Sequence, residues 1–169
     1  MKIKTERCEI IKSNNRELKK SIDTKADKPF ELPSVKLSAG QNVEDYMPAI
    51  KALFAHLMKM ESSIDDMIFE IKVADQLAGY VRLVNIFGDK PELQVALLPM
   101  YWGQGYASEV LEVTIPYLFE EFGFEEMIWH VNPNNKASVK LALKLGAFFD
   151  EESTKAVGSI IETYIFKKQ

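Results

Sequence analysis

The chain has 169 residues, 47% of them hydrophobic, which is enough for one domain with a substantial core and too few for two ordinary domains. Its formal net charge is −4, and acidic and basic residues are mixed along the chain, so the basic face of a nucleic-acid-binding protein is not expected. The charged first residues and the lack of a long apolar run predict a cytoplasmic protein without a signal segment or a membrane span.

The first third of the chain predicts a strand and two helices joined by a long loop. Residues 6–12 favour a strand, in which the single cysteine, Cys8, is expected to be a buried hydrophobe rather than a nucleophile. Polar residues 13–15 offer a cap for a helix that runs to about residue 22. Residues 23–40 contain three helix breakers and predict an irregular connection, and connections of that length are often functional. Helical spacing returns over residues 46–58.

The middle of the chain predicts an antiparallel meander. Residues 67–73 alternate apolar and polar side chains, residues 74–76 form a turn, and residues 77–87 are rich in β-branched and aromatic side chains. A second turn at residues 88–91 leads into an apolar strand at residues 93–98.

The last third predicts two helices, each followed by strands. Helical spacing begins after Gly105 and should end near Gly123, with a kink at Pro116, because proline removes one amide and collides with the preceding turn. The remaining predicted elements are a strand at residues 127–131, an Asn-rich turn at 132–135, a short helix at 136–145 closed by Gly146, and two strands at 148–152 and 159–167.

Two glycines separate the strand at residues 93–98 from the helix that follows. Gly103 and Gly105 allow backbone conformations that a Cβ obstructs, and they let a ligand approach the main chain. The first amides of a helix lack intrahelical partners and can receive phosphate oxygens. The pattern therefore predicts an anion site, although a tight strand-to-helix connection without a ligand fits the same two glycines.

These elements and motifs together resemble the GNAT superfamily of acetyl-CoA-dependent N-acetyltransferases. The family signature reads Arg or Gln, two residues, Gly, one residue, then Gly or Ala, and residues 100–105 fit it except at Met100. Two further motifs, residues 101–109 and the Asn135-x-x-Ser138 pair, look most like the branch that includes ribosomal-protein N-terminal acetyltransferases. The resemblance implies an α/β fold, with a single mixed, mostly antiparallel central sheet flanked by helices on both faces.

The resemblance also implies where acetyl-CoA binds. Main-chain groups around Ala96, Leu97 and Leu98 would hold the pantetheine, and one amide there would face the thioester oxygen. Asn135 matches a residue that contacts the cofactor arm, although simple capping of the next helix explains it equally well. The remaining residues expected to bind the cofactor belong to the glycine turn and the start of its helix: Gly103, Gln104, Gly105, Tyr106 and Ala107.

Aminolysis of a thioester requires a neutral amine, so a base or a water relay is helpful. Glu92 matches an acidic residue common in the branch and is the candidate base; the alternative is an ordinary solvent-facing strand end. Ser138 matches a residue near the sulfur and is expected to donate a hydrogen bond to the leaving thiolate, unless its hydroxyl bonds only to nearby backbone. His56 and His130 lie in separate elements, and no metal site is predicted.

The predicted function is transfer of an acetyl group from acetyl-CoA to a primary amine by direct attack in a ternary complex. The acceptor is either a protein N-terminus or a small-molecule amine, and the enzyme is expected to be a monomer or a homodimer that binds no nucleic acid. A GNAT-fold module that binds CoA without catalysis is the alternative, and Met100 at the first signature position keeps it open.

Overall fold

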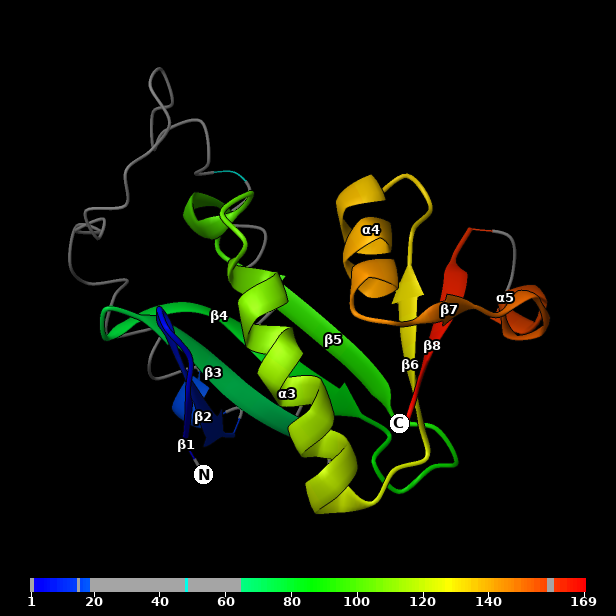
Figure 1. The fold of residues 1–169 in the computed structure, drawn as a ribbon, viewed down its shortest axis with the longest axis horizontal. Coiled ribbons are helices and arrows are strands. Elements are labelled where there is room, and N and C mark those ends of the chain that lie inside the picture. The colour runs from blue at the N-terminus through cyan, green and yellow to red at the C-terminus, as the bar shows by residue number, and fades with distance from the viewer. Residues whose placement is uncertain (1, 15, 19–47, 49–64, 158–159) are drawn as a thin grey trace.

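A single mixed sheet organises the part of the chain that the computed structural model describes, which is residues 2–14, 16–18, 48, 65–157 and 160–169. In this part the sheet has eight strands in the spatial order β1-β2-β3-β4-β5-β6-β8-β7 (Figure 1). The strands are β1 (Lys2–Lys4), β2 (Cys8–Ser13), β3 (Met67–Val73), β4 (Gln76–Val84), β5 (Glu92–Leu97), β6 (Glu126–Val131), β7 (Phe148–Phe149) and β8 (Glu162–Lys167). The helical segments are η1 (Pro99–Tyr101), α3 (Tyr106–Phe122), α4 (Lys136–Lys144) and α5 (Glu151–Val157).

The strands β5 and β6 are the parallel neighbours in this sheet, and the other recorded pairings are antiparallel. In this parallel pair, Glu92 of β5 lies opposite Ile128 of β6. Beyond that pair the two strands diverge, so that β5 and β6 form a V that is closed at Glu92 (Figure 1). The open arm of the V on β5 therefore has main-chain groups that no neighbouring strand pairs.

Alternation along the strands assigns side chains to the two faces of the sheet. Leu93 and Leu97 of β5, like Met127 and Trp129 of β6, belong to the main hydrophobic core. That core also contains Leu111, Ile115 and Leu118 of α3, so this face of the sheet is the one that α3 covers (Figure 1). A smaller cluster of Leu18, Ile68, Leu77 and Tyr80, with Ala96 packed against it, lies on the opposite face.

The helix α3 begins and ends at glycines with left-handed backbone. Gly105 has φ +83° at the N-cap and Gly123 has φ +68° at the C-cap, conformations that cost little without a Cβ. The helix continues as one element through Pro116. The kink expected at this proline stays a prediction.

The predicted fold class is confirmed, and several strand boundaries need correction, including that of the strand predicted at residues 77–87, which ends at Val84. The short charged strand β1 was not predicted; Lys2 and Lys4 form ion pairs with Glu9 of its partner strand. The strand predicted at residues 148–152 is wrong after Phe149, because Asp150 accepts a hydrogen bond from the Ser153 amide at 3.0 Å and starts α5. The last strand begins at Glu162 rather than at residue 159.

Several expectations concern parts of the chain outside the described residues. These are the first helix beyond residue 18, the irregular segment at residues 23–40 and almost all of the helix at residues 46–58. The expectation for Cys8 is confirmed, since this side chain is 3% exposed in the core. In the described part of the chain, none of the helices is long and apolar enough to cross a membrane.

Candidate functional site

A pocket of about 690 Å³ lies between the glycine turn, the start of α3, the open edge of β5 and the first turns of α4. We call it the first pocket. Residues that are far apart in the sequence meet here. The helix α4 follows β6 at the open end of the V, so it lies across the pocket from the end of β5. Eight of the predicted site residues line it: Ala96, Leu97, Gly103, Gly105, Tyr106, Ala107, Asn135 and Ser138. Glu92, Leu98 and Gln104 are predicted site residues that do not line it.

The glycine turn presents open main chain to the first pocket. Gly103 has φ +69° and Gly105 has φ +83°, and the Cβ position of Gly103 has no heavy atom within 4 Å. The first hydrogen bond of α3 runs from the Glu109 amide to the Gly105 carbonyl at 3.0 Å. The amides of residues 106–108 therefore have no intrahelical acceptor, and they carry the positive end of the helix dipole. This end of the pocket is suited to phosphate oxygens.

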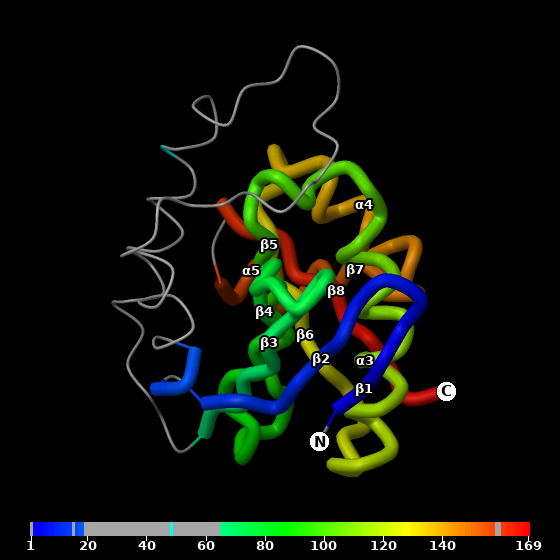
Figure 2. Tube along the Cα trace, turned by 90° about the vertical axis from the view of Figure 1, so that its left-hand side faces the viewer, coloured from blue at the N-terminus to red at the C-terminus, as the bar shows by residue number. Residues whose placement is uncertain are grey.

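Arg7, in the turn between β1 and β2, braces the glycine turn from outside. Its Nη1 donates to the Gln104 carbonyl at 3.1 Å, its Nε donates to Glu109 Oε2 at 2.6 Å, and its guanidinium lies 4.3 Å from the centre of the Tyr106 ring. Figure 2 shows the β1–β2 hairpin lying along α3. Burial raises the pKa of Glu109, but hydrogen bonds from Thr5 and Arg7 outweigh it and leave that pKa below its ordinary value. Arg7 was not predicted from the sequence.

Some main-chain amides and carbonyls at the open edge of β5 have partners within the protein, and others point toward the V. The Leu98 amide donates to the Ala78 carbonyl of β4 at 2.8 Å, and the Leu98 carbonyl accepts from the Tyr101 amide at 2.9 Å. Because the direction of main-chain groups alternates along a strand, the amides of Val95 and Leu97 point toward the V. The Leu97 carbonyl is occupied, since it accepts from Trp102 Nε1 at 2.7 Å. The Val95 and Leu97 amides are thus the ones positioned for a ligand.

The first pocket extends along this edge from one face of the sheet to the other. Val95 and Ala96 are consecutive, and their side chains point to opposite faces, yet both line the pocket. Gly79 of β4 keeps the main chain close at this point, because a Cβ on it would lie 2.1 Å from the Ala96 carbonyl oxygen. Gly79 was not singled out from the sequence, where it is one glycine inside an expected strand.

Ser138 and Asn135 occupy the opposite wall of the first pocket. The Asn135 side chain accepts from the Ser138 amide at 3.2 Å, so Asn135 is the N-cap of α4. The Ser138 hydroxyl oxygen accepts from the indole Nε1 of Trp129 at 3.1 Å. Because the indole is only a donor, the hydroxyl hydrogen of Ser138 stays available for a ligand.

Glu92 lies at the closed end of the V, on the face of the sheet opposite α3. Its Oε1 accepts from Gln94 Nε2 at 2.9 Å, and its Oε2 lies 3.3 Å from His130 Nδ1. Ala96 is four positions beyond Glu92 along the strand, which is roughly 13 Å at about 3.3 Å per residue. A carboxylate at that distance reaches the first pocket only through other groups.

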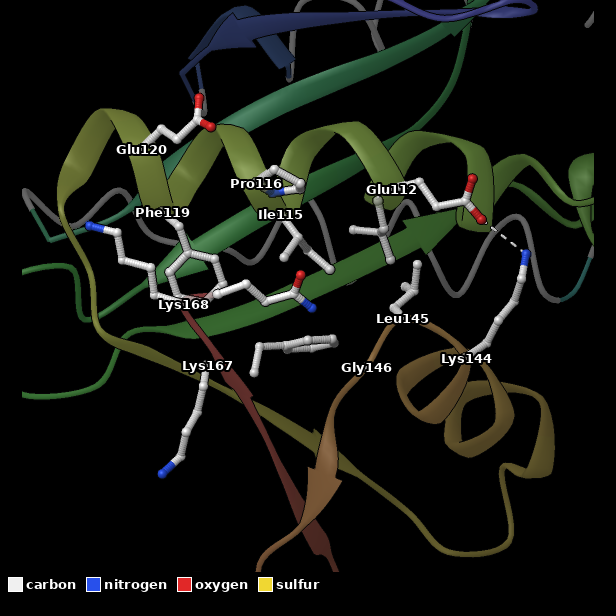
Figure 3. Close-up of a pocket in the computed structure, with 13 residues that line it drawn as sticks. Glu112, Ile115, Pro116, Phe119, Glu120, Lys144, Leu145, Gly146, Lys167 and Lys168 are labelled. Atoms are coloured by element: carbon white, nitrogen blue, oxygen red, sulfur yellow. Dashed lines mark hydrogen bonds and ion pairs between the residues drawn. The ribbon is translucent and has the colours of Figure 1, made fainter.

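A second pocket of about 540 Å³ lies farther along α3, beside the end of β8. Figure 3 shows Ile115, Phe119 and Leu145 directed into it, while Lys167 points away. Lys144 separates the two pockets, since its Nζ lies 2.5 Å from Ser108 Oγ and 3.0 Å from Glu112 Oε1. None of the predicted site residues lines the second pocket.

Comparison with known proteins agrees with this architecture. The sequence profile of the acetyltransferase (GNAT) domain matches residues 33–147. Over 55 residues the chain is 36% identical to the Bacillus subtilis protein YkkB, and over 116 residues it is 27% identical to the uncharacterized N-acetyltransferase p20 of Bacillus licheniformis. These matches cover 32% and 64% of this chain and the same shares of the two relatives, so the chain spans less than two thirds of either relative.

A solved structure shares the whole fold. The GNAT-family acetyltransferase from Bacillus anthracis superimposes with a TM-score of 0.61 at 20% identity, covering 99% of this chain and 98% of that protein. The family profile covers more than half of the chain and includes the glycine turn and α4. This chain belongs to the GNAT family of acetyltransferases.

Proposed function

We propose that this protein transfers the acetyl group of acetyl-CoA to a primary amine, by direct attack of the amine in a ternary complex. The observation that carries the proposal is the first pocket, which joins the glycine turn to the open edge of β5 and to Ser138. A pocket of about 690 Å³ with amides at one end and a strand edge along its wall suits a long, flexible molecule with phosphates at one end.

Each part of the first pocket has a role in this proposal. The amides that follow Gly105 receive the pyrophosphate, and the Val95 amide pairs with an amide of the pantetheine arm. The Leu97 amide faces the thioester oxygen, where a preorganised donor stabilises the developing oxyanion by about 2.7–4 kcal/mol. The Asn135 side chain contacts the cofactor arm while it caps α4. Ala96, Gly103, Tyr106 and Ala107 complete the wall along the cofactor.

Leu98 and Gln104 were predicted to bind the cofactor, and we propose a structural role for them instead. Both main-chain groups of Leu98 already have partners within the protein, and the Gln104 side chain donates to the Met100 carbonyl at 2.6 Å. We therefore assign to these two residues the shaping of the strand end and of the turn. The same bond keeps the Met100 carbonyl in place, so a methionine at the first signature position is compatible with a formed glycine turn.

Ser138 and Glu92 serve the chemistry. The Ser138 hydroxyl donates a hydrogen bond to the sulfur, which is sufficient because a thiolate leaves readily with little acid assistance. The Glu92 carboxylate supplies a base on the amine side of the V, and it takes up the amine proton through a group that it holds. The motifs at residues 101–109 and 135–138 resemble those of the ribosomal-protein N-terminal acetyltransferases, so peptide N-termini are the first acceptors to test.

The test is a panel of peptides and small amines assayed by release of free thiol from acetyl-CoA. We expect thiol release that depends on one class of amine and a melting temperature that rises with CoA. A rise in melting temperature without turnover on any amine would instead favour the non-catalytic module. No effect of CoA on the melting temperature, together with no turnover, would overturn both functions.

A further inference from the structure

We propose that His130 is the catalytic residue that takes the proton from the amine, and that Glu92 acts through it as a positioning residue. This inference rests on the proposed function and names the proton acceptor of the same site. It starts from one contact, the 3.3 Å between His130 Nδ1 and Glu92 Oε2, which joins the two arms of the V near its closed end.

His130 lies farther toward the open end of the V than Glu92 does. Glu92 is in register with Ile128, and His130 follows Ile128 by two residues on the same face of β6. In a parallel pair this advances the side chain by roughly 7 Å toward the open end. The Cα of His130 therefore lies about half of the way along the V from Glu92 to Ala96, just outside the residues that line the first pocket.

The strand β6 carries His130 and Trp129 to opposite sides of the reaction site. Trp129 points to the α3 face, where its indole holds the Ser138 hydroxyl at 3.1 Å. His130, the next residue, points to the other face. A thioester held along the β5 edge thus has Ser138 on the cofactor side, and an amine that approaches from the other side meets His130.

The nearby Glu92 carboxylate also favours one tautomer of the His130 ring. A carboxylate beside Nδ1 favours the tautomer with its hydrogen there, which leaves the lone pair on Nε2. Gln94 donates to the second oxygen of Glu92 at 2.9 Å and holds the carboxylate in place. The side chains of His130 and Glu92 are 22% and 23% exposed, so the pair is shielded but can still exchange protons with water.

Other charged groups on this face of the sheet have partners of their own. Arg82, in register with Gln94, forms an ion pair with Asp66. Glu126, at the start of β6, is held by Lys90 and Lys167 at 2.7 and 3.0 Å. In the described part of the chain, Glu92 is the carboxylate recorded within ion-pair distance of His130.

Two buried polar atoms beside the V have no partner in the described structure. They are Nε of Arg82, whose residue is in register with Gln94, and Oγ1 of Thr163, whose residue is in register with His130. Each therefore lies next to one arm of the V. Buried polar atoms are usually satisfied by protein, water or a ligand.

In the proposed step, one proton moves from the substrate ammonium to His130. An N–H bond of the substrate ammonium breaks and an N–H bond forms at Nε2 of His130, giving an imidazolium opposite the Glu92 carboxylate. The freed lone pair on nitrogen then attacks the thioester carbon, and the C–S bond breaks with its electron pair on sulfur. The attacking nitrogen loses its second proton to the solvent, and the imidazolium proton returns to the thiolate or to water, so the products are the amide and free CoA.

The test compares His130→Gln, Glu92→Gln and the double variant, with Glu126→Gln as a matched carboxylate control on the same face of β6. Glutamine at position 130 keeps a donor for Glu92 but cannot accept a proton at neutral pH. We expect kcat to fall by roughly 10²- to 10⁴-fold in His130→Gln, while the affinity for CoA stays unchanged. The loss should shrink as pH rises, because more of the amine is then already neutral.

The double variant shows whether the two residues act as a unit. We expect its loss to be close to that of His130→Gln alone, because Glu92 has no route to the amine except through His130. Full activity of His130→Gln, a loss that is constant across pH, or a double loss equal to the product of the single losses would overturn the inference. These outcomes differ from failure of the proposed function, in which the unmodified enzyme itself releases no thiol.

Discussion

The two pockets along α3 have similar volumes, about 690 and 540 Å³, and very different walls. The first is lined by the glycine turn, the unpaired edge of β5 and the Ser138 hydroxyl, so main-chain donors face its interior. The second has apolar side chains directed into it and charged side chains at its rim, several of them already paired (Figure 3). Volume alone does not distinguish a site from a hollow between packed elements, whereas unsatisfied donors do.

The difference arises from the two halves of one helix. The first turn of α3 has free amides and the positive end of the dipole, and the later turns have their amides bonded along the helix. Pro116 belongs to the second half and lines the second pocket. Changes in the first half should therefore alter ligand binding, and changes in the second half should alter only stability.

Among the changes that distinguish the two pockets, Gly105→Asp is expected to have the largest effect. The added carboxylate brings negative charge to the turn, and its Cβ lies 3.6 Å from Arg7 Nη2 of the brace, so we expect the affinity for CoA to fall by roughly 2–4 kcal/mol, on the order of 30- to 1000-fold. Calorimetry measures this. Gly105→Asn controls for the strain of the left-handed backbone, and Lys168→Asp puts a carboxylate at the second pocket. Equal affinities for all three variants would contradict the distinction between the pockets.

Gly79→Ala tests the close packing behind the β5 edge. The added methyl meets the Ala96 carbonyl oxygen at 2.1 Å, so one strand must shift. Overpacking of this kind costs about 1–3 kcal/mol, which lowers the melting temperature by roughly 2–12 °C. We expect weaker CoA binding as well, because the Val95 and Leu97 amides move with the strand. A thermal melt that matches the unmodified protein would show that the strand end adapts without cost.

Glu109→Gln tests the brace on the glycine turn. The pKa of Glu109 is below its ordinary value of 4.5, so the carboxylate stabilises the fold at pH values above 4.5, and this contribution is lost as the pH falls through the lowered pKa. We expect Glu109→Gln to cost about 1 kcal/mol at neutral pH. The difference between the two proteins should vanish in acid, as urea titrations at several pH values can show. A difference that persists in strong acid would have another cause.

Ser138→Ala should have a small effect on the rate. It removes one donor to a leaving group that departs adequately alone, and a hydrogen bond of about 0.5–1.5 kcal/mol corresponds to a loss of only about 2- to 13-fold in kcat. Steady-state assays with acetyl-CoA measure it. Because Trp129 would lose its acceptor, Ser138→Thr is the matched control that keeps the hydroxyl. A loss larger than that of His130→Gln would reverse the ranking of the two roles.

Pro116→Ala is expected to have the smallest effect and to act only in the second half of α3. Alanine restores a helix donor, but the packing is adapted to proline, so stability should change by about 1 kcal/mol in either direction. Binding of CoA should not change. A measurable change in CoA affinity would mean that the two pockets are coupled through α3.

Local patterns predicted part of the first pocket, and long-range pairing determined the rest. Gly103 and Gly105 were found because a glycine turn is visible within a few residues, and Ser138 was found through the resemblance to the family branch. Arg7 was missed because its partners, Gln104 and Glu109, follow about a hundred residues later. His130 was considered only as a metal ligand and was rejected in that role. The register of β5 with β6 shows that Glu92 is its neighbour.

The brace between the β1–β2 turn and α3 has a consequence for the order of folding. The Arg7 and Glu109 side chains are 102 positions apart in the sequence, so their contact closes a very long loop. The logarithmic part of that closure entropy is on the order of 4 kcal/mol, which must be offset by contacts made elsewhere in the sheet. Contacts of such high sequence separation slow folding. We therefore expect the glycine turn to reach its braced form late in folding, after α3 and the sheet have formed.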